Sequence, residues 1–133
     1  MNRIVLVVLL AAVSSNVMAD WVPITEGSDK DTTIYANPDN ILWSNNRAKL
    51  LVLFDYKTPR TVADSRPYLS TKYEFEIDCN GNQSRLLGVI AFSGNMGAGE
   101  VIYTHNFNNP WTAVRPRSID QGILNFACGI KTI

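Results

Sequence analysis

The chain has 133 residues, enough for one small domain, and carries 12 basic and 12 acidic side chains. This balance excludes the marked basic excess that is typical of nucleic-acid-binding proteins. A chain of this size buries roughly two thirds of its unfolded surface on folding, so a real core is expected. We therefore predict a folded domain that has no nucleic-acid partner.

The first 19 residues have the pattern of a secretory signal peptide. Arg3 precedes the unbroken apolar run 4–13, and Val17 and Ala19 occupy the −3 and −1 positions of a cleavage site. A membrane anchor needs about 20 apolar residues, and this run is about half as long. We predict cleavage between Ala19 and Asp20, a single domain over residues 20–133, and no stable membrane span after the signal is removed.

In chain order, the first expected elements are short strands at residues 21–24 and 33–36, followed by a turn at 37–40. The segment 49–56 is apolar on both sides, as is 84–94, which indicates central strands covered on each face by a helix, another sheet or a partner chain. A single helix would leave part of such a sheet uncovered. A homodimer through a sheet face or edge is therefore one hypothesis.

The connection between residues 57 and 68 is long and mostly basic. It carries Lys57, Arg60 and Arg66 against the single acidic residue Asp64. Connections of this length are often functional or mobile. We interpret this segment as a candidate surface for docking a protein partner.

The next strand, residues 72–79, alternates between apolar and charged side chains. Asn80 and Gly81 follow it and suit a tight hairpin turn, because both tolerate positive φ. Glu74 and Glu76 fall on one face, about 7 Å apart at two strand rises. That spacing suits the paired carboxylates of a hydrolase, although any solvated sheet face gives the same pattern, and Lys72 beside them favours the solvated face.

A glycine cluster, AFSGNMGAGEV, occupies residues 91–101. It lacks the Gly-Lys-Ser/Thr ending of a phosphate loop, and a strand at 100–104 follows it where a phosphate cradle needs a helix. It therefore predicts a hairpin loop with bulge positions, spanning Gly94 to Gly99, with Met96 at an exposed tip.

A C-terminal helix is predicted over residues 118–128. Ser118 is a good N-cap, Gln121 completes a capping box, and Gly129 is suited to end the helix in the left-handed conformation. The apolar residues of one helix face recur at helical spacing: Ile119, Ile123, Phe126 and Ala127.

Arg115 and Arg117 precede this N-cap, where the positive end of the helix dipole disfavours positive charge. We expect an internal acidic partner to compensate, drawn from Glu74, Glu76 or Asp78. The alternative is an acidic ligand or a partner protein. Trp111, just before them, fits either a place under the helix or an interface anchor.

The two cysteines, Cys79 and Cys128, both lie in the part predicted to be exported. An even number of cysteines in an oxidising compartment predicts a disulfide. Closing a loop of this size would stabilise the fold by about 4 kcal/mol. A metal pair is the alternative, but there is no C-x-x-C motif and His105 is the only histidine, so no metal, cofactor or catalytic residue is expected.

Together these elements predict an α+β domain: an antiparallel sheet of about six strands with one C-terminal helix across a face. The chain resembles the surface-adhesin protein E-like family of small exported bacterial proteins. The resemblance covers nearly all of the predicted mature chain and rests on the order and spacing of segments, which are the N-terminal Trp21, TIYANPDNI, LFDYKTP, RPYLSTKYEFEIDC, SRLLGVIAFSGNMGAGEVIY, PWTAVRPRSI and FACG.

The resemblance implies an antiparallel sheet whose C-terminal helix is tied on by a disulfide between Cys79 and Cys128. It also implies an exported, non-enzymatic module that binds host matrix or serum proteins. The family's adhesin is lipid-anchored, which requires a Cys at the first mature position, whereas this chain has Asp20 there. We expect a periplasmic or secreted protein. A soluble periplasmic accessory or small-ligand-binding protein is the alternative, and a hydrolase is the alternative of another class.

Overall fold

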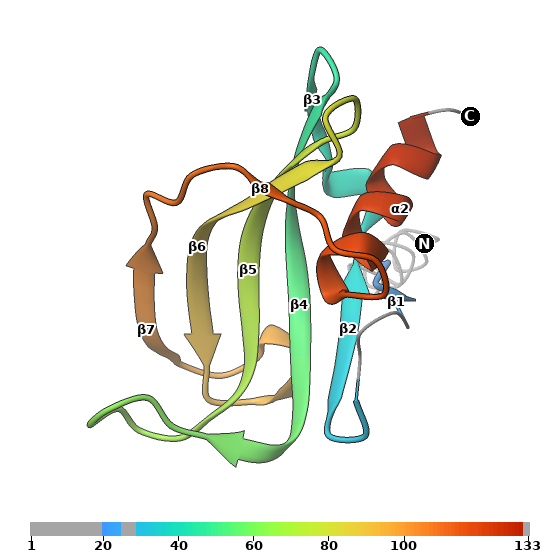
Figure 1. Ribbon diagram of the computed structural model, residues 1–133. Coiled ribbons are helices and arrows are strands. Elements are labelled where there is room, and N and C mark those ends of the chain that lie inside the picture. The colour runs from blue at the N-terminus through green and yellow to red at the C-terminus, as the bar shows by residue number, and fades with distance from the viewer. Residues whose placement is uncertain (1–19, 25–28, 132–133) are drawn as a thin grey trace, which may run out of the picture.

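The described part of the chain, residues 20–24 and 29–131 of a computed structural model, forms one antiparallel sheet with a helix against one face (Figure 1). The predicted signal peptide, including Ala19, and the last two residues lie outside the described residues. The face that carries the helix is called the helix face below, and the opposite face is called the back face.

Six strands follow one another across the sheet, and two short strands are added to its central members. The order is β1 (Val22–Ile24), β2 (Thr32–Ala36), β4 (Arg47–Arg60), β5 (Tyr68–Asp78), β6 (Gln83–Phe92) and β7 (Val101–Asn106). β3 (Leu42–Ser44) pairs with β4, and β8 (Thr112–Ala113) pairs with β6. The predicted antiparallel sheet of about six strands is confirmed.

The β4–β5 hairpin is longer than predicted, and its connection is shorter. β4 continues to Arg60 and β5 begins at Tyr68, which leaves only residues 61–67 as a loop. The extension is held because the Lys57 N–H donates to the Asp31 carbonyl at 2.9 Å and Arg60 pairs with Tyr68. The predicted connection over 57–68 is therefore wrong at its start, where strand pairing takes over.

The β5–β6 turn lies where Asn80 and Gly81 predict it, but its left-handed residue is Asn82, with φ of 53°. The Asp78 carboxylate accepts the N–H groups of Asn80 and Gly81, both at 3.1 Å. A Cβ on Gly81 would lie 2.8 Å from Asp78 Oδ2. Glycine therefore suits this position because the carboxylate end of the Asp78 side chain comes close, and not because of a positive φ.

The helix α2 spans Ile119–Lys131. Ser118 caps it, because its Oγ accepts the Gln121 N–H at 3.2 Å. The Gln121 side chain donates to Asn125 at 2.8 Å and so does not complete the predicted capping box. Gly129 lies inside the helix, which corrects the prediction that it ends the helix. Glycine adopts helical and left-handed conformations alike, so its presence alone does not stop a helix.

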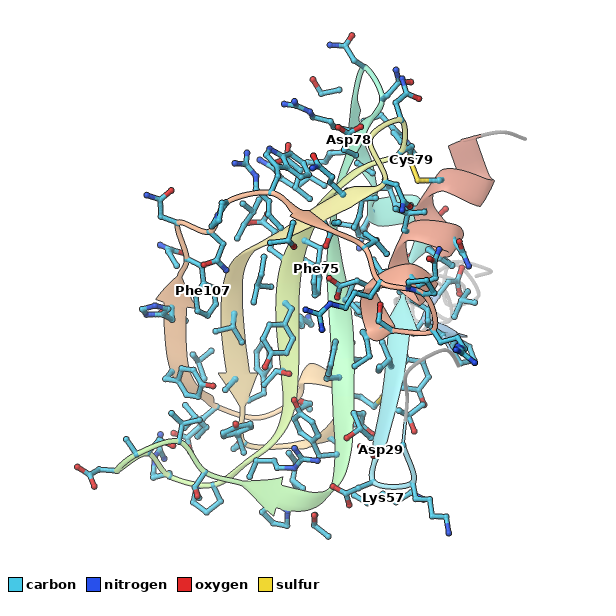
Figure 2. All side chains as sticks on the ribbon, in the orientation of Figure 1. Asp29, Lys57, Phe75, Asp78, Cys79 and Phe107 are labelled. Carbon is cyan, nitrogen blue, oxygen red and sulfur yellow. A yellow bond between two sulfur atoms is a disulfide. The ribbon has the colours of Figure 1, made fainter. Side chains whose placement is uncertain are left out.

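The main core lies between α2 and the helix face. Ile123 and Ala127 are fully buried against apolar side chains of β1, β2, β4 and β5. The disulfide between Cys79, just after β5, and Cys128 on α2 is confirmed, with 5.7 Å between the Cα atoms (Figure 2). The Ser84 hydroxyl also donates to Asp120 at 2.8 Å, which joins the first helical turn to β6.

The glycine cluster covers the back face of the central strands. Its turn η2 (Asn95–Gly97) lies between β6 and β7, so the prediction of a connection between two strands is confirmed. Met96 donates its N–H to Asp55 at 2.7 Å, and Gly97 donates to Ser70 at 2.9 Å. The turn therefore folds back over β4 and β5, where Leu53 is fully buried. β4 is apolar on both faces, and this turn covers its back face as α2 covers its helix face.

Candidate functional site

The helix face is only partly covered by the helix. α2 contacts β1, β4 and β5, and Figure 1 shows that β6 and β7 at the far end of the sheet carry no helix in front of them. We call the helix-covered side, which includes β5, the covered half and the side formed by β6 and β7 the open half. The open half is where a partner can reach this face.

Aromatic side chains gather on the helix face beyond the reach of the helix. Tyr56, Tyr68 and Ala91 form a second buried cluster, with Tyr103 packed against it. The rings meet edge to face, with centroids 6.0 Å apart for Tyr56 and Tyr68 and 5.6 Å apart for Tyr68 and Tyr103. The arrangement is the one that the ring quadrupoles favour.

Two adjoining cavities meet at Tyr73, and together we call them the aromatic groove. The larger, of about 340 Å³, is lined by Val62, Tyr73, Val89, Tyr103, Thr104, His105 and Phe107. The smaller, of about 210 Å³, is lined by Asp29, Thr32, Ile34, Phe54, Tyr56, Arg60, Tyr73 and Ile119. The groove therefore reaches from the start of α2 to β7, and the β4–β5 loop contributes Val62 to its wall. Phe107 lies at the β7 end in Figure 2.

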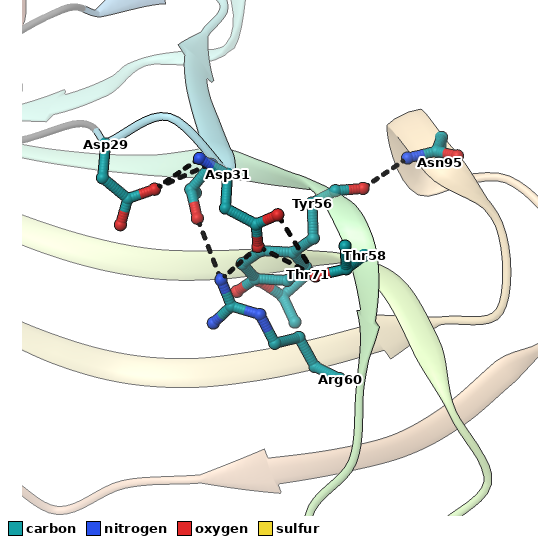
Figure 3. A network of polar contacts seen from close by, with 8 residues as sticks. Asp29, Asp31, Tyr56, Thr58, Arg60, Thr71 and Asn95 are labelled. Carbon is teal, nitrogen blue, oxygen red and sulfur yellow. Dashed lines mark hydrogen bonds and ion pairs between the residues drawn. The ribbon is translucent and has the colours of Figure 1, made fainter.

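A polar network anchors the base of the hairpin beside the groove (Figure 3). Arg60 Nη2 donates to Asp31 at 2.9 Å and to Thr32 at 3.2 Å, and its guanidinium lies 4.3 Å from the centre of the Tyr56 ring. The Tyr56 hydroxyl in turn shares a buried hydrogen bond with Thr71 at 3.0 Å. This network holds the hairpin in place over the sheet.

Burial and charge pairing shift several pKa values around the groove. The hydrogen bond from Arg60 lowers the pKa of Asp31 below its ordinary value of 3.8 and raises that of Arg60. Burial raises the pKa values of Tyr56 and Tyr103 well above the ordinary value of 10.0. Both tyrosines are therefore neutral phenols at neutral pH, and the aromatic character of the groove carries no phenolate charge.

The three basic residues predicted to form a docking surface are only partly available. Arg60 is paired with Asp31, and Arg66 lies 3.5 Å from Glu100, with both side chains of that second pair well exposed. Lys57 is exposed on β4, three residues before that strand ends, and is labelled in Figure 2. The hairpin that carries them thus borders the groove with much of its positive charge offset.

Arg115 and Arg117 do not have the internal partner that the sequence predicts. Both are exposed, and within residues 20–24 and 29–131 neither takes part in an ion pair. Glu76 is bound by Arg85 instead, at 2.7 Å. Arg117 has a φ of 61° and turns the chain into the helix. The prediction fails because Glu76 points to the back face, away from the helix.

Glu74 and Glu76 lie side by side on the back face of β5, as their alternation predicts. The Glu76 side chain is 15% exposed and accepts two contacts from the Arg85 guanidinium, at 2.7 and 2.9 Å. Trp111 lies over this pair, with the Arg85 and Arg47 guanidinium carbons 4.6 and 5.1 Å from its ring centre. Trp111 therefore stacks on arginines of the back face and does not pack under the helix.

The remaining candidate residues lie apart from one another. Met96 is 41% exposed on the back-face turn. His105 is exposed on β7 and packs edge to face with Phe107, their ring centres 4.7 Å apart. Across the described ranges, no three His, Cys, Asp or Glu side chains are arranged to hold a metal ion. No described helix is both long and apolar enough to cross a membrane.

The aromatic groove is not predicted by any pattern in the sequence. Its members come from β2, β4, β5, β6, β7, the first residue of α2 and the adjoining loops, so no local motif marks them. One signal was available: four of the five tyrosines fall on β4, β5 and β7, namely Tyr56, Tyr68, Tyr73 and Tyr103. Tyrosines repeated at such positions indicate a surface that is both apolar and accessible.

Comparison with known proteins identifies the family. The family model described as Surface-adhesin protein E matches residues 21–129. The selenomethionine form of Haemophilus influenzae protein E superposes with a TM-score of 0.66 at 11% identity, over 89% of this chain and 94% of that chain. Its crystal form II gives a TM-score of 0.65 at 10% identity, over 86% and 91%.

At such low identity these structures establish a shared fold, and no curated protein sequence matches this chain significantly. The family match is independent of them and extends from the residue before β1 into α2. The chain therefore belongs to the surface-adhesin protein E family.

Proposed function

We propose that this chain is an exported, non-enzymatic protein-binding module that contacts partner proteins through the aromatic groove and the hairpin beside it. One observation carries the proposal: the helix leaves an apolar, aromatic half of its own sheet face accessible. Accessible aromatic residues are the side chains that most often anchor protein interfaces.

Host extracellular-matrix or serum proteins are the partners that we propose, because the family is that of a surface adhesin. The offset charges of the hairpin indicate how such a partner is bound. Arg60 and Arg66 both have acidic neighbours, so contact with the groove would rest mainly on apolar and aromatic surface. Lys57 would lie at the rim, where a charge affects the association rate more than the affinity.

The non-enzymatic part of the proposal rests on the family and on the state of the paired carboxylates. Glu76 is engaged by Arg85, and the guanidinium of Arg85 is itself stacked on Trp111. A carboxylate held in this way is a structural anion. The ion pair would have to separate before the Glu76 carboxylate could contact a substrate.

The test is binding of the purified mature chain, with its disulfide intact, to a panel of immobilised host matrix and serum proteins. Val62 is 47% exposed and lines the groove, so Val62→Glu places a charge in the apolar site without disturbing the core. We expect Val62→Glu to weaken binding by about tenfold or more, the cost of a buried unpaired charge.

Val22→Glu is the matched control, because Val22 is 40% exposed at the opposite end of the sheet. It should bind as the unmodified chain does. Equal binding by both variants would remove the groove from consideration, and binding no stronger than to a plain blocked surface would remove the adhesin function itself. Sedimentation of the same samples would show whether a second copy of the chain occupies this face.

A further inference from the structure

β7 forms one outer edge of the sheet. It pairs with β6 on one side, and among the described residues no strand pairs with its other side. In Figure 1 it lies at the end of the sheet farthest from α2. Its residues are largely exposed, including Val101 at 52%.

The pairing register shows which backbone groups of β7 face outward. Phe107 donates its N–H to the Leu87 carbonyl at 2.9 Å, and His105 lies opposite Val89 in the same register. In an antiparallel ladder every second residue bonds to its neighbour strand, and the residues between point the other way. The N–H and C=O groups of Thr104 and Asn106 are therefore directed away from β6, toward the open edge.

This edge lacks the devices that proteins use to prevent strand addition. β1, at the opposite end of the sheet, has three residues, and one of them is Pro23. β7 has six residues, VIYTHN, without proline, lysine or an acidic residue. Short edge strands, prolines and charges are the usual protection against a further strand. The β7 edge is consequently a template for an extended peptide.

The groove lies directly beside this edge on the helix face. Tyr103 and His105 point to that face and line its larger cavity together with Val62 and Phe107. Alternate side chains of a strand added next to β7 would lie on the same face. No Lys, Arg, Asp or Glu lines this cavity, so charge complementarity selects an uncharged, apolar side chain.

We propose that β7 receives an extended segment of a partner protein as an added strand, whose apolar side chains at alternate positions enter the larger cavity of the groove. The inference rests on the proposed protein-binding function and specifies its mode. Main-chain hydrogen bonds to Thr104 and Asn106 supply affinity, and the cavity supplies the sequence preference.

The experiment selects peptides from a phage-displayed dodecapeptide library on the disulfide-bonded mature chain. Thr104→Pro removes the outward N–H without removing a bond to β6, a substitution that edge strands tolerate. Thr104→Val is the matched control, since it changes the side chain and keeps the N–H. Selected peptides should show apolar residues at every second position and bind Thr104→Pro at least about tenfold more weakly than Thr104→Val.

A second readout uses the unmodified chain, so that it does not depend on folding of the proline variant. Bound peptide should slow amide hydrogen exchange at Thr104 and Asn106 and leave β1 unchanged. The inference is overturned by absence of enriched peptides, by equal affinity for both variants, or by unchanged exchange at these two amides. It is also overturned if the unmodified chain sediments as a dimer that Thr104→Pro dissociates, because a second copy then occupies the edge.

The two proposals fail separately. If matrix proteins bind Thr104→Pro as they bind Thr104→Val, the adhesin function stands and strand addition is excluded. If selected peptides depend on the Thr104 N–H while no matrix or serum protein binds, strand addition stands and the host-protein partner is excluded.

Discussion

The covered half and the open half share one sheet face and differ in what lies over them. In the covered half, Ile34, Ile77 and Ile123 are fully buried, and the disulfide joins the helix to the sheet. In the open half, Tyr103 and His105 face a cavity. A helix about 10 Å across spans about two strand spacings of about 4.8 Å, so one helix cannot cover six strands. Stability is concentrated on one side, and accessible apolar surface is left on the other.

Removing the disulfide should produce the largest effect. Replacing Cys79 and Cys128 together by Ala should lower the free energy of unfolding by about 4 kcal/mol, because the 49-residue separation is no longer closed in the unfolded chain. Urea denaturation of the mature chain measures this loss. Amide exchange should accelerate first in α2, and equal acceleration in β6 and β7 would contradict the division into halves.

A matched pair of truncations compares the halves directly. Ile123→Ala in the covered half should cost about 3 kcal/mol, since Ile123 is fully buried against the sheet. Val101→Ala on β7 should cost less than about 0.5 kcal/mol, because Val101 is exposed. Thermal and urea unfolding of both variants give the two values. Similar losses would show that the β7 edge is more buried in solution than its exposure indicates.

Loosening the back-face turn η2, which belongs to neither half, should lower stability less than these core changes do. Asp55 Oδ1 accepts both the Met96 N–H and the Asn95 amide, at 2.7 and 3.1 Å. Asp55→Ala should lower stability by about 1 kcal/mol and speed exchange of the Met96 amide. Asp64→Ala, in the exposed 61–67 loop, is the control and should change neither quantity. An unchanged Met96 amide in Asp55→Ala would mean that the turn is held by its other contacts.

The smallest effect is a pH dependence at the base of the hairpin. Arg60 lowers the pKa of Asp31, so their pairing stabilises the fold above the ordinary carboxyl pKa and is lost as the pH falls through the lowered value. The pair is well exposed, so the change in melting temperature will be slight. When the pH is lowered from about 7 to about 3, the melting temperature of Asp31→Asn should fall less than that of the unmodified chain. Equal losses would assign the acid sensitivity to other carboxylates.

Local patterns predicted those features that depend on neighbours in sequence. The alternation around Tyr73 and Phe75 placed them on one face, and the position of Ser118 marked the start of the helix. The errors arose where a distant segment intervened. The hydrogen bond between the Lys57 N–H and the Asp31 carbonyl extends β4 beyond its predicted end. Glu76, one of the acidic partners expected for Arg115 and Arg117, forms its ion pair with Arg85. The aromatic groove was not predicted because strands, loops and the start of α2 that lie far apart in the chain build it together.

The sequence by itself determined which side chains share a face, because the strand period of two and the helix period of 3.6 are local properties of the backbone. It also determined the disulfide, since the chain has two cysteines and is predicted to be exported. Tertiary structure alone decided which part of each face is covered. The covered part of each face depends on where the 13-residue helix α2 and the turn η2 pack, and both are far along the chain from most of the strands that they cover. The uncovered remainder, with the β7 edge beside it, is therefore visible only in the folded chain.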